Sequence, residues 1–246
     1  MPIEPCGLAL GVIGLAALFT TCVECFDYVE ASRTYGRDYE VLLTKLEVEK
    51  TRFLIWGETV GIIEPRDDVR GPTIYNPQIS STIERILGSI QAIFTDSETV
   101  LSRYGLEPLP PASDQYRAIT GLSSNLMDRC RDSYAKFLNR AGRFQRRTTA
   151  TAKIRWAIRD RSKFTVMISD LKDLIDGLMH IMPSAQFEER RILREQFDSI
   201  SDIASLSLLQ EACADDYVDC SETASICIGS VVDLGNCEEI HGMHSV

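Results

Sequence analysis

The sequence has few histidines and lacks three motifs that mark common classes of enzyme. It contains only three histidines, His180, His241 and His244. No glycine-rich phosphate loop follows a predicted strand, no Walker-type lysine ends such a loop, and no G-x-S-x-G nucleophile elbow is present. His180 falls at the end of a predicted helix, where a cap or surface role is more common than catalysis. We therefore expect a protein that is not an enzyme and that needs no cofactor.

Lysine and arginine are missing from the last part of the chain. Residues 195–246 carry 11 Asp/Glu and no Lys or Arg. Basic residues gather instead between Arg129 and Lys163, with 12 Lys/Arg against Asp132 and Asp160. The acidic tail either packs against this basic stretch or leaves it as a cationic face for an anionic surface. The formal net charge of −10 disfavours nucleic acid as a partner of the whole chain.

Cysteines are too few, and too irregularly spaced, to staple the fold with disulfides. The eight are Cys6, Cys22, Cys25, Cys130, Cys213, Cys220, Cys227 and Cys237. Reduced thiols in a cytoplasmic protein explain them most simply. The C-x-x-C pair Cys22 and Cys25 lies in a predicted helix, with no strand before it and no second matching pair. A tail set could supply four zinc ligands, but its spacing fits no standard zinc site: Cys227, Cys237, His241 and His244. We expect no metal.

One long stretch lacks charge altogether. The 18 residues Cys6–Val23 contain no charged side chain, and as a helix they would span about 27 Å, just short of a bilayer core of about 30 Å. A permanent membrane anchor is disfavoured because Glu24 and Asp27 follow at once and no basic residue appears until Arg33. The favoured interpretation is a helix buried in a helical bundle, where an apolar surface all round is expected.

The same stretch resembles a signal peptide only in part. Signal peptides carry basic residues before the apolar run, and here the only charged residue is Glu4. Small residues such as Ala16 and Ala17 could mimic a cleavage site, so a secreted effector whose first helix is removed stays as an alternative. Gly7 and Gly11 have the spacing of helix-pairing motifs in bilayers. A segment that suits both a protein core and a lipid core can be bistable.

Helical periodicity dominates the remaining sequence. Predicted helices cover 38–61, 77–104, a stretch from 113, 164–182, 184–197 and 199–215. Asn76 and Pro77 form a helix start, Pro183 ends the most regular amphipathic segment, and Glu49 interrupts an otherwise apolar stripe. Residues 148–158 suit either a short strand or a short helix. We expect an all-α fold, an irregular helical bundle of about seven to nine helices, with at most one very short strand pair.

The domain organisation follows from where the helical pattern stops. Residues 1–215 form the helical domain, and residues 216–246 form an acidic, cysteine-containing tail that need not be ordered.

Several fragments, in this order, carry a resemblance to a known family. They are Glu4-Pro5 before the apolar run, Cys22–Glu30 (CVECFDYVE), Arg33–Glu40 (RTYGRDYE), Arg52–Glu58 (RFLIWGE), and Ala150–Asp160 with Trp156. Together they resemble the HeLo domain family, the fungal HET-S-type prion-inhibition and propagation domains, over roughly residues 1–210. The chain departs from the family at Glu84-Arg85, where paired acids are often found, and its tail has no Asn/Gly-rich amyloid repeat.

The resemblance implies a pore-forming cell-death effector of the heterokaryon-incompatibility type. Such proteins are held inactive in the cytoplasm with the first helix packed against the bundle. An amyloid-bearing activator or receptor in trans then refolds the domain, the helix is released, and homo-oligomers, dimers or larger, permeabilise the cell membrane. The inserting residues would be Gly7, Leu8, Leu10, Gly11, Val12, Ile13, Gly14, Leu15, Leu18 and Phe19.

Two further residue sets complete this interpretation. Residues bracketing the first helix and forming its junction with the second would regulate release: Glu4, Glu24, Arg33, Thr34, Gly36, Arg37 and Asp38. Basic residues of the central stretch would dock on anionic lipid: Arg140, Arg143, Arg146, Arg147, Lys153 and Arg155. A non-inserting helical adaptor, an inactive homologue and the secreted effector remain alternatives.

Overall fold

The computed structural model describes residues 5–32, 36–63, 76–109, 116–117, 155–200 and 202–242; the side chains of 5–13, 30–32, 116–117 and 232–242 are not among those described. Within these ranges lie eight helices and four short strands. The helices are α1 (Pro5–Phe26), α2 (Arg37–Thr59), α3 (Pro77–Thr95), α4 (Ser97–Ser102), α7 (Arg161–Ile181), α8 (Pro183–Asp198), α9 (Ile203–Cys213) and α10 (Val218–Gly242).

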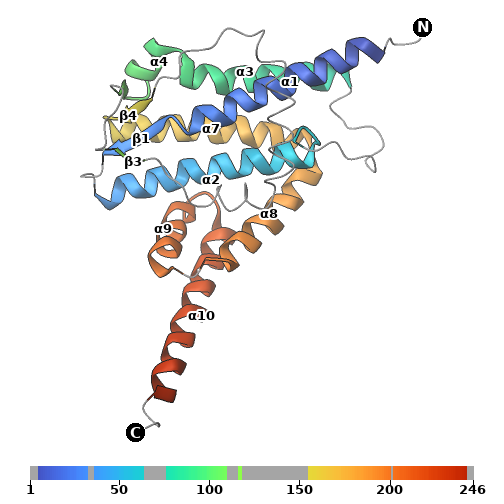
Figure 1. The fold of residues 1–246 in the computed structure, drawn as a ribbon. Coiled ribbons are helices and arrows are strands. Elements are labelled where there is room, and N and C mark those ends of the chain that lie inside the picture. The colour runs from blue at the N-terminus through green and yellow to red at the C-terminus, as the bar shows by residue number, and fades with distance from the viewer. Residues whose placement is uncertain are drawn as a thin grey trace.

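Four long helices form the body of the bundle. Figure 1 shows α1, α2, α3 and α7 lying alongside one another, with α8 and α9 beyond α2. Helix α1 packs against α2 and α3, while α7 packs against α2, α3 and α8. The largest fully buried side chains at the centre of these contacts are aromatic: Trp56, Phe19, Phe53, Phe164 and Phe197. The expected all-α irregular bundle is confirmed.

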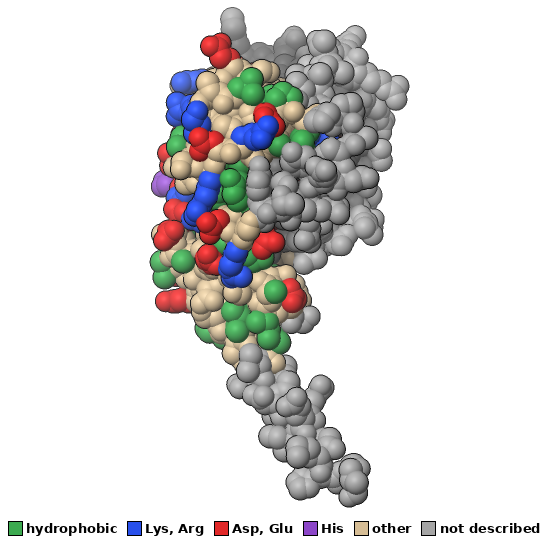
Figure 2. Space-filling model, turned by 90° about the vertical axis from the view of Figure 1, so that its left-hand side faces the viewer, with side chains coloured by type: hydrophobic (Ala, Val, Ile, Leu, Met, Phe, Trp, Pro, Cys, Tyr) green, Lys and Arg blue, Asp and Glu red, His purple; other side chains and the backbone are tan. Residues whose placement is uncertain are grey.

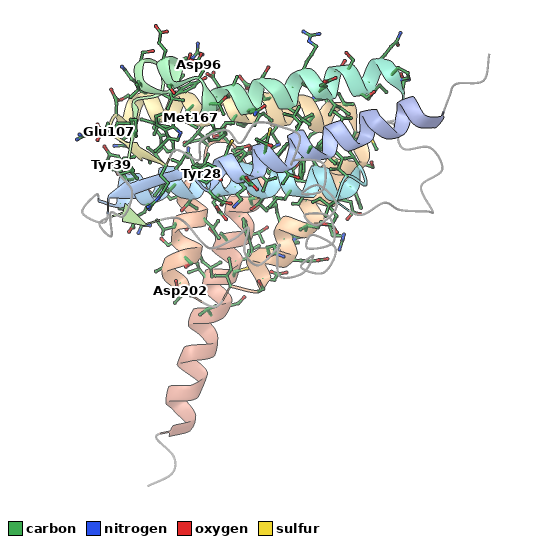
Figure 3. The ribbon with its side chains drawn as sticks, turned by 45° about the horizontal axis from the view of Figure 1, so that its top comes forward. Tyr28, Tyr39, Asp96, Glu107, Met167 and Asp202 are labelled. Carbon is green, nitrogen blue, oxygen red and sulfur yellow. The ribbon has the colours of Figure 1, made fainter. Side chains whose placement is uncertain are left out.

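Local sequence signals set several helix boundaries. The Asn76 side chain accepts a hydrogen bond from the Gln78 amide at 3.0 Å, and Pro77 occupies the first turn of α3. Pro183 ends α7 and opens α8 at its own first turn. The single helix expected over 77–104 is instead two, because Asp96 caps a new helix by accepting from the Thr99 amide at 3.5 Å, and also from its hydroxyl at 2.8 Å. Figure 3 shows Asp96 near the junction of α3 and α4.

A small sheet joins four distant segments, where the sequence suggested at most one strand pair. Its strands are β1 (Val29–Ser32), β2 (Leu106–Pro108), β3 (Tyr116–Arg117) and β4 (Trp156–Ile158), in the order β2-β4-β1-β3. Strands β1 and β4 are parallel, and the other two pairs are antiparallel. Such pairings depend on contacts between residues far apart in the chain, so no local alternation of side chains predicted them.

Gly105 makes the turn into β2 possible. Its φ angle of +63° is one that side-chain-bearing residues rarely adopt, and its carbonyl accepts the amides of Arg159 and Asp160 at 2.9 and 3.1 Å. A Cβ at this position would lie 2.5 Å from the Cβ of Asp160. The turn therefore fixes the start of α7 against the strand.

The segment after residue 215 includes a helix, where the sequence suggested an acidic tail. Helix α10 packs against α9 and α8, with Ala224 and Cys227 buried. Figure 1 shows the later part of α10 extending away from the bundle. The first turns of α10 therefore share the core of the preceding helices.

Candidate functional site

Helix α1 buries one face of its C-terminal half. Leu15, Phe19, Cys22, Val23 and Phe26 are each at most 4% exposed, and their spacing of three and four residues defines one helical stripe. Of the predicted insertion residues, Leu15 and Phe19 are therefore in the core, Leu18 is half-buried and Gly14 is exposed. The other six lie on α1 with side chains outside those described: Gly7, Leu8, Leu10, Gly11, Val12 and Ile13.

Phe19 is the central contact between α1 and α2. Its ring centroid lies 4.5 Å from that of Phe53 and 6.1 Å from that of Trp56. The ring also covers Gly57, where a Cβ would lie 2.3 Å from the Phe19 Cζ atom. Because real Cβ atoms essentially never approach another atom that closely, glycine at position 57 is a condition for this packing of α1.

A second set of contacts joins α1 to α3. The Cys22 thiol donates a hydrogen bond to the Leu87 carbonyl at 3.2 Å, and the Phe26 ring lies 5.2 Å from that of Phe94. Burial raises the pKa of Cys22 well above its usual value and that of Cys25 to about 12. Both thiols stay protonated, which disfavours a redox role for this C-x-x-C pair.

The end of α1 is fixed by an ion pair and by the sheet. Asp27, just after the helix, pairs with Lys50 of α2, whose side chain is 7% exposed. The Trp156 amide donates to the Tyr28 carbonyl at 2.6 Å, beside the pairing of β1 with β4. Figure 3 shows Tyr28 at this end of α1. These contacts hold the C-terminal end of the helix while its N-terminal end reaches the edge of the bundle (Figure 1).

Four of the seven predicted junction residues lie within the described ranges. Arg37 pairs with Glu211 of α9 at 2.8 Å, and Asp38 pairs with Arg161 of α7. Gly36 precedes α2 with an extended backbone that any residue adopts. Glu24 is half-buried on α1. Three predicted junction residues lie outside the described ranges: Glu4, Arg33 and Thr34.

A buried charged cluster joins α2 to helices other than α1, and sequence reasoning did not assemble it. Arg52 is 4% exposed and bonds to Glu49 at 2.9 Å, to Asp176 of α7 at 2.6 Å, and to Glu189 of α8. Tyr217, just before α10, accepts from Arg52 and donates to Glu49, both at 2.5 Å. The cluster therefore joins α2 to α7, α8 and the start of α10. Its signal in the sequence was Glu49, the interruption in the apolar stripe.

The charges of this cluster depend on one another. Burial raises the pKa of Glu49, although Arg52 and Tyr217 act to lower it. Burial disfavours the charge of Arg52, but Glu49 and Glu189 outweigh it and raise the pKa of the guanidinium. Burial and Glu49 also raise the pKa of Tyr217. Arg52 is thus a permanent cation whose removal would leave Glu49 buried without its counter-ion.

Two acids at the boundary between the predicted domain and tail pair with Lys45 of α2. Lys45 lies 3.3 Å from Asp215 and 3.9 Å from Asp216. Figure 2 shows acidic and basic side chains interspersed over the described part of the face in view. Of the predicted lipid-docking residues, Arg155 is half-buried, and its carbonyl accepts from the Leu109 amide at 2.8 Å. The other five lie outside the described ranges: Arg140, Arg143, Arg146, Arg147 and Lys153.

The remaining predictions concern a membrane span, a metal site and the histidine of α7. Among the residues with described side chains, which in α1 begin at Gly14, no helix is long and apolar enough to span a bilayer. In the same part of the chain, no group of three or more His, Cys, Asp and Glu side chains could hold a metal ion. His180 lies at the exposed end of α7, with Nδ1 2.7 Å from the Asp176 carbonyl.

Comparisons with known proteins agree with this architecture. Two heterokaryon incompatibility proteins from Podospora anserina, s and S, are 27% and 26% identical to the chain, each over 96% of it and 79% of their own length. A solved structure of the HET-s N-terminal domain superposes with a TM-score of 0.57 at 24% identity, covering 89% of this chain and 98% of that domain. A double mutant of that domain gives a TM-score of 0.55. The model of the HeLo family, described as prion-inhibition and propagation, matches residues 7–209, and the chain therefore belongs to the HeLo family.

Proposed function

We propose that this protein is a non-enzymatic cell-death effector of the fungal heterokaryon-incompatibility type that acts by permeabilising membranes. In the resting state it is cytoplasmic, with α1 packed against α2 and α3. On activation by an amyloid-bearing partner in trans, α1 leaves the bundle, the protein relocates to the cell membrane, and homo-oligomers form the pore. Membership of the HeLo family and the names of the two Podospora relatives support the cell-death role.

One observation supports the proposed role of α1 more than any other. The uncharged stretch Cys6–Val23 lies on a single helix, and the second half of that helix contributes a stripe to the core. A helix of 22 residues is about 33 Å long, which matches a bilayer core of about 30 Å. The same helix therefore suits two apolar surroundings, and the contacts of Phe19, Cys22 and Phe26 decide between them.

Gly14 allows insertion to be tested without disturbing the resting fold. It lies near the middle of the uncharged stretch and is exposed, and a Cβ at this position would have nothing within 4 Å of it. Gly14→Asp should therefore leave the bundle folded. In a bilayer, however, a charge near the centre of a helix costs about 2.5–3.5 kcal/mol.

The experiment is dye release from vesicles of phosphatidylcholine and phosphatidylserine. Gly57→Ala, which disturbs the packing of Phe19, serves as a variant that needs no activator. We expect Gly57→Ala to release dye faster than the unmodified chain, and added Gly14→Asp to abolish the gain. Gly229→Asp is the matched control, because Gly229 is an exposed helical glycine of α10 with open space around it. Equal release by Gly57→Ala with and without Gly14→Asp would remove α1 from the mechanism.

A further inference from the structure

The turn between α9 and α10 brings two cysteines together. Cys213 is the last residue of α9 and is fully buried, whereas Cys220 lies in the first turn of α10 and is half-buried. The Tyr217 amide donates to the Cys213 carbonyl at 2.8 Å, and the Cys220 amide donates to the Tyr217 carbonyl at 3.0 Å. Two backbone hydrogen bonds through one residue thus link the two cysteines, and each thiol shifts the pKa of the other.

The helices on either side hold this arrangement in place. The Gln210 side chain donates to the Ser225 hydroxyl at 2.6 Å, and the Ser221 hydroxyl donates to the Gln210 carbonyl at 3.1 Å. Cys213 belongs to the main hydrophobic core, and Cys220 packs against it. The pair therefore meets on a packed helical hairpin rather than on a loose loop.

The two thiols differ in chemical character from each other and from the other described cysteines. The hydrogen bond from Cys213 lowers the pKa of Cys220, and the same bond, together with burial, raises that of Cys213. Burial raises the pKa of Cys22, Cys25 and Cys227. Among the five cysteines whose side chains are described, Cys220 is also the one that is not buried, so a dissolved oxidant reaches its thiol most readily, and the thiolate is the form that reacts.

We infer that Cys220 and Cys213 form a reversible redox pair, with Cys220 as the thiolate attacked by a peroxide and Cys213 as the resolving thiol that closes a disulfide across the α9–α10 turn. This site is independent of the proposed membrane activity. Transient disulfides of this kind are the form in which cytoplasmic proteins use oxidation as a signal.

The steps balance with hydrogen peroxide as the oxidant. The Cys220 thiolate attacks one peroxide oxygen, the O–O bond breaks, and the products are Cys220 sulfenic acid and hydroxide. The Cys213 sulfur then attacks the Cys220 sulfur, an S–S bond forms, and the hydroxyl leaves as water with the thiol proton. In sum, two thiols are oxidised and one peroxide is reduced to two waters. A dithiol reductant restores both thiols by exchange through a mixed disulfide.

The bond would constrain a segment that the charged cluster uses. The six residues between the two cysteines include Tyr217, which bonds to Arg52 and Glu49 of α2. Closing the loop would hold Tyr217 in its bonded position and join the start of α10 covalently to α9. Amide hydrogen exchange at residues 214–221 should therefore slow in the oxidised protein.

The test treats the reduced, folded chain with one equivalent of hydrogen peroxide, blocks the remaining thiols by alkylation, and measures intact mass. Before alkylation we expect a loss of about 2 Da, the mass of two hydrogen atoms, and after alkylation two fewer alkyl groups than on the reduced chain. A dithiol should reverse both differences. Trypsin cannot separate the cysteines because no Lys or Arg follows Arg194, but Asp215, Asp216 and Asp219 lie between them. Proteases that cut at acidic residues therefore locate the bond.

Matched variants make the result specific. Cys227→Ser should form the bond as the unmodified chain does, since Cys227 bonds to Asp198 on another helix. Cys220→Ser and Cys213→Ala should each fail to lose the two hydrogens. The inference is overturned if both thiols stay free under peroxide, or if Cys220 is found linked to a cysteine other than Cys213.

Discussion

The Phe19 ring of α1 lies directly over Gly57 of α2, so closely that the side chain of alanine would collide with it. Gly57→Ala should therefore lower the free energy of unfolding by about 1–3 kcal/mol, the usual cost of overpacking a core. Chemical denaturation measures the change. Gly88→Ala on α3 is the matched control, because nothing lies within 4 Å of a Cβ there and replacing a helical glycine by alanine gains up to about 1 kcal/mol.

Phe19→Leu should partly rescue Gly57→Ala, since the smaller side chain makes room for the new methyl group. A double-mutant cycle on the free energy of unfolding measures this coupling, which for residues in contact is typically about 0.5–3 kcal/mol. If the two substitutions simply add, the close contact between Phe19 and Gly57 does not govern the packing of α1.

The charged cluster gives a second prediction. Arg52→Met should lower the free energy of unfolding by about 3–5 kcal/mol, because Glu49 then stays buried without its counter-ion. Tyr217→Phe, which removes one donor to Glu49, should cost about 1–3 kcal/mol. Arg103→Met is the control, since Arg103 is 57% exposed in its pair with Asp170 and such solvent-screened surface pairs contribute little to stability. Similar small losses for Arg52→Met and Arg103→Met would contradict a structural role for the cluster.

Titration of Glu49 should contribute to the change in the free energy of unfolding with pH. The pKa of Glu49 is raised in the folded protein, whereas in the unfolded chain it is about 4.3. As the pH falls, the folded state therefore takes up a proton at a higher pH than the unfolded state does. Ionised Glu49 therefore costs stability at neutral pH, and this cost disappears as the pH falls. The difference in unfolding free energy between the unmodified chain and Glu49→Gln should shift in favour of the unmodified chain on acidification. A difference that stays constant as the pH falls from 7 to the unfolded value of about 4.3 would refute this assignment.

The Asp176 carboxyl should change the pH dependence of stability in the opposite direction to Glu49, and at lower pH. Burial acts to raise its pKa, but hydrogen bonds from Lys172 and Arg52 outweigh it, so the pKa is lowered overall. Its contribution to stability is present above the unfolded value of about 3.9 and is lost as the pH falls through the folded value. The two carboxyls are therefore distinguishable in one pH series, with Asp176→Asn as the second variant.

The basic stretch provides a prediction that rests on the sequence. Reversing Arg140 and Arg143 to Glu should weaken binding to phosphatidylserine vesicles, since each basic residue near an anionic leaflet contributes about 1 kcal/mol. Vesicle co-sedimentation measures the affinity, and neutral vesicles should show no change. Arg190→Glu with Arg194→Glu is the control, because both are on α8, outside the basic stretch. An equal loss in both variants would point to net charge rather than to a docking site.

Sequence reasoning succeeded where the determining interaction is local. Asn76 with Pro77 predicted the start of α3, and Pro183 predicted the boundary between α7 and α8. The uncharged first segment predicted a core helix, and the burial of Phe19 and Cys22 agrees with that expectation. In each case the signal lies within a few residues of the feature that it predicts.

Sequence reasoning failed where a feature depends on a residue far away in the sequence. No residue near Glu49 in the sequence indicates that the Tyr217 hydroxyl, 168 residues later, donates a hydrogen bond to it. The four-stranded sheet likewise pairs Val29 with Trp156, and neither strand is long enough to show alternation. Buried polar residues that interrupt an apolar stripe were the available clue, but they do not identify their partners.

The central claim is that α1 exchanges the protein core for lipid. Vesicles containing a lipid with a photoreactive acyl chain test it most directly, with Gly57→Ala as the loosened form and peptide mapping of the adducts. We expect the adducts to fall within residues 5–26 and to be more abundant for Gly57→Ala than for the unmodified chain. If the vesicles leak while the adducts map elsewhere, for example to the exposed Phe187 of α8, the proposed role of α1 is wrong.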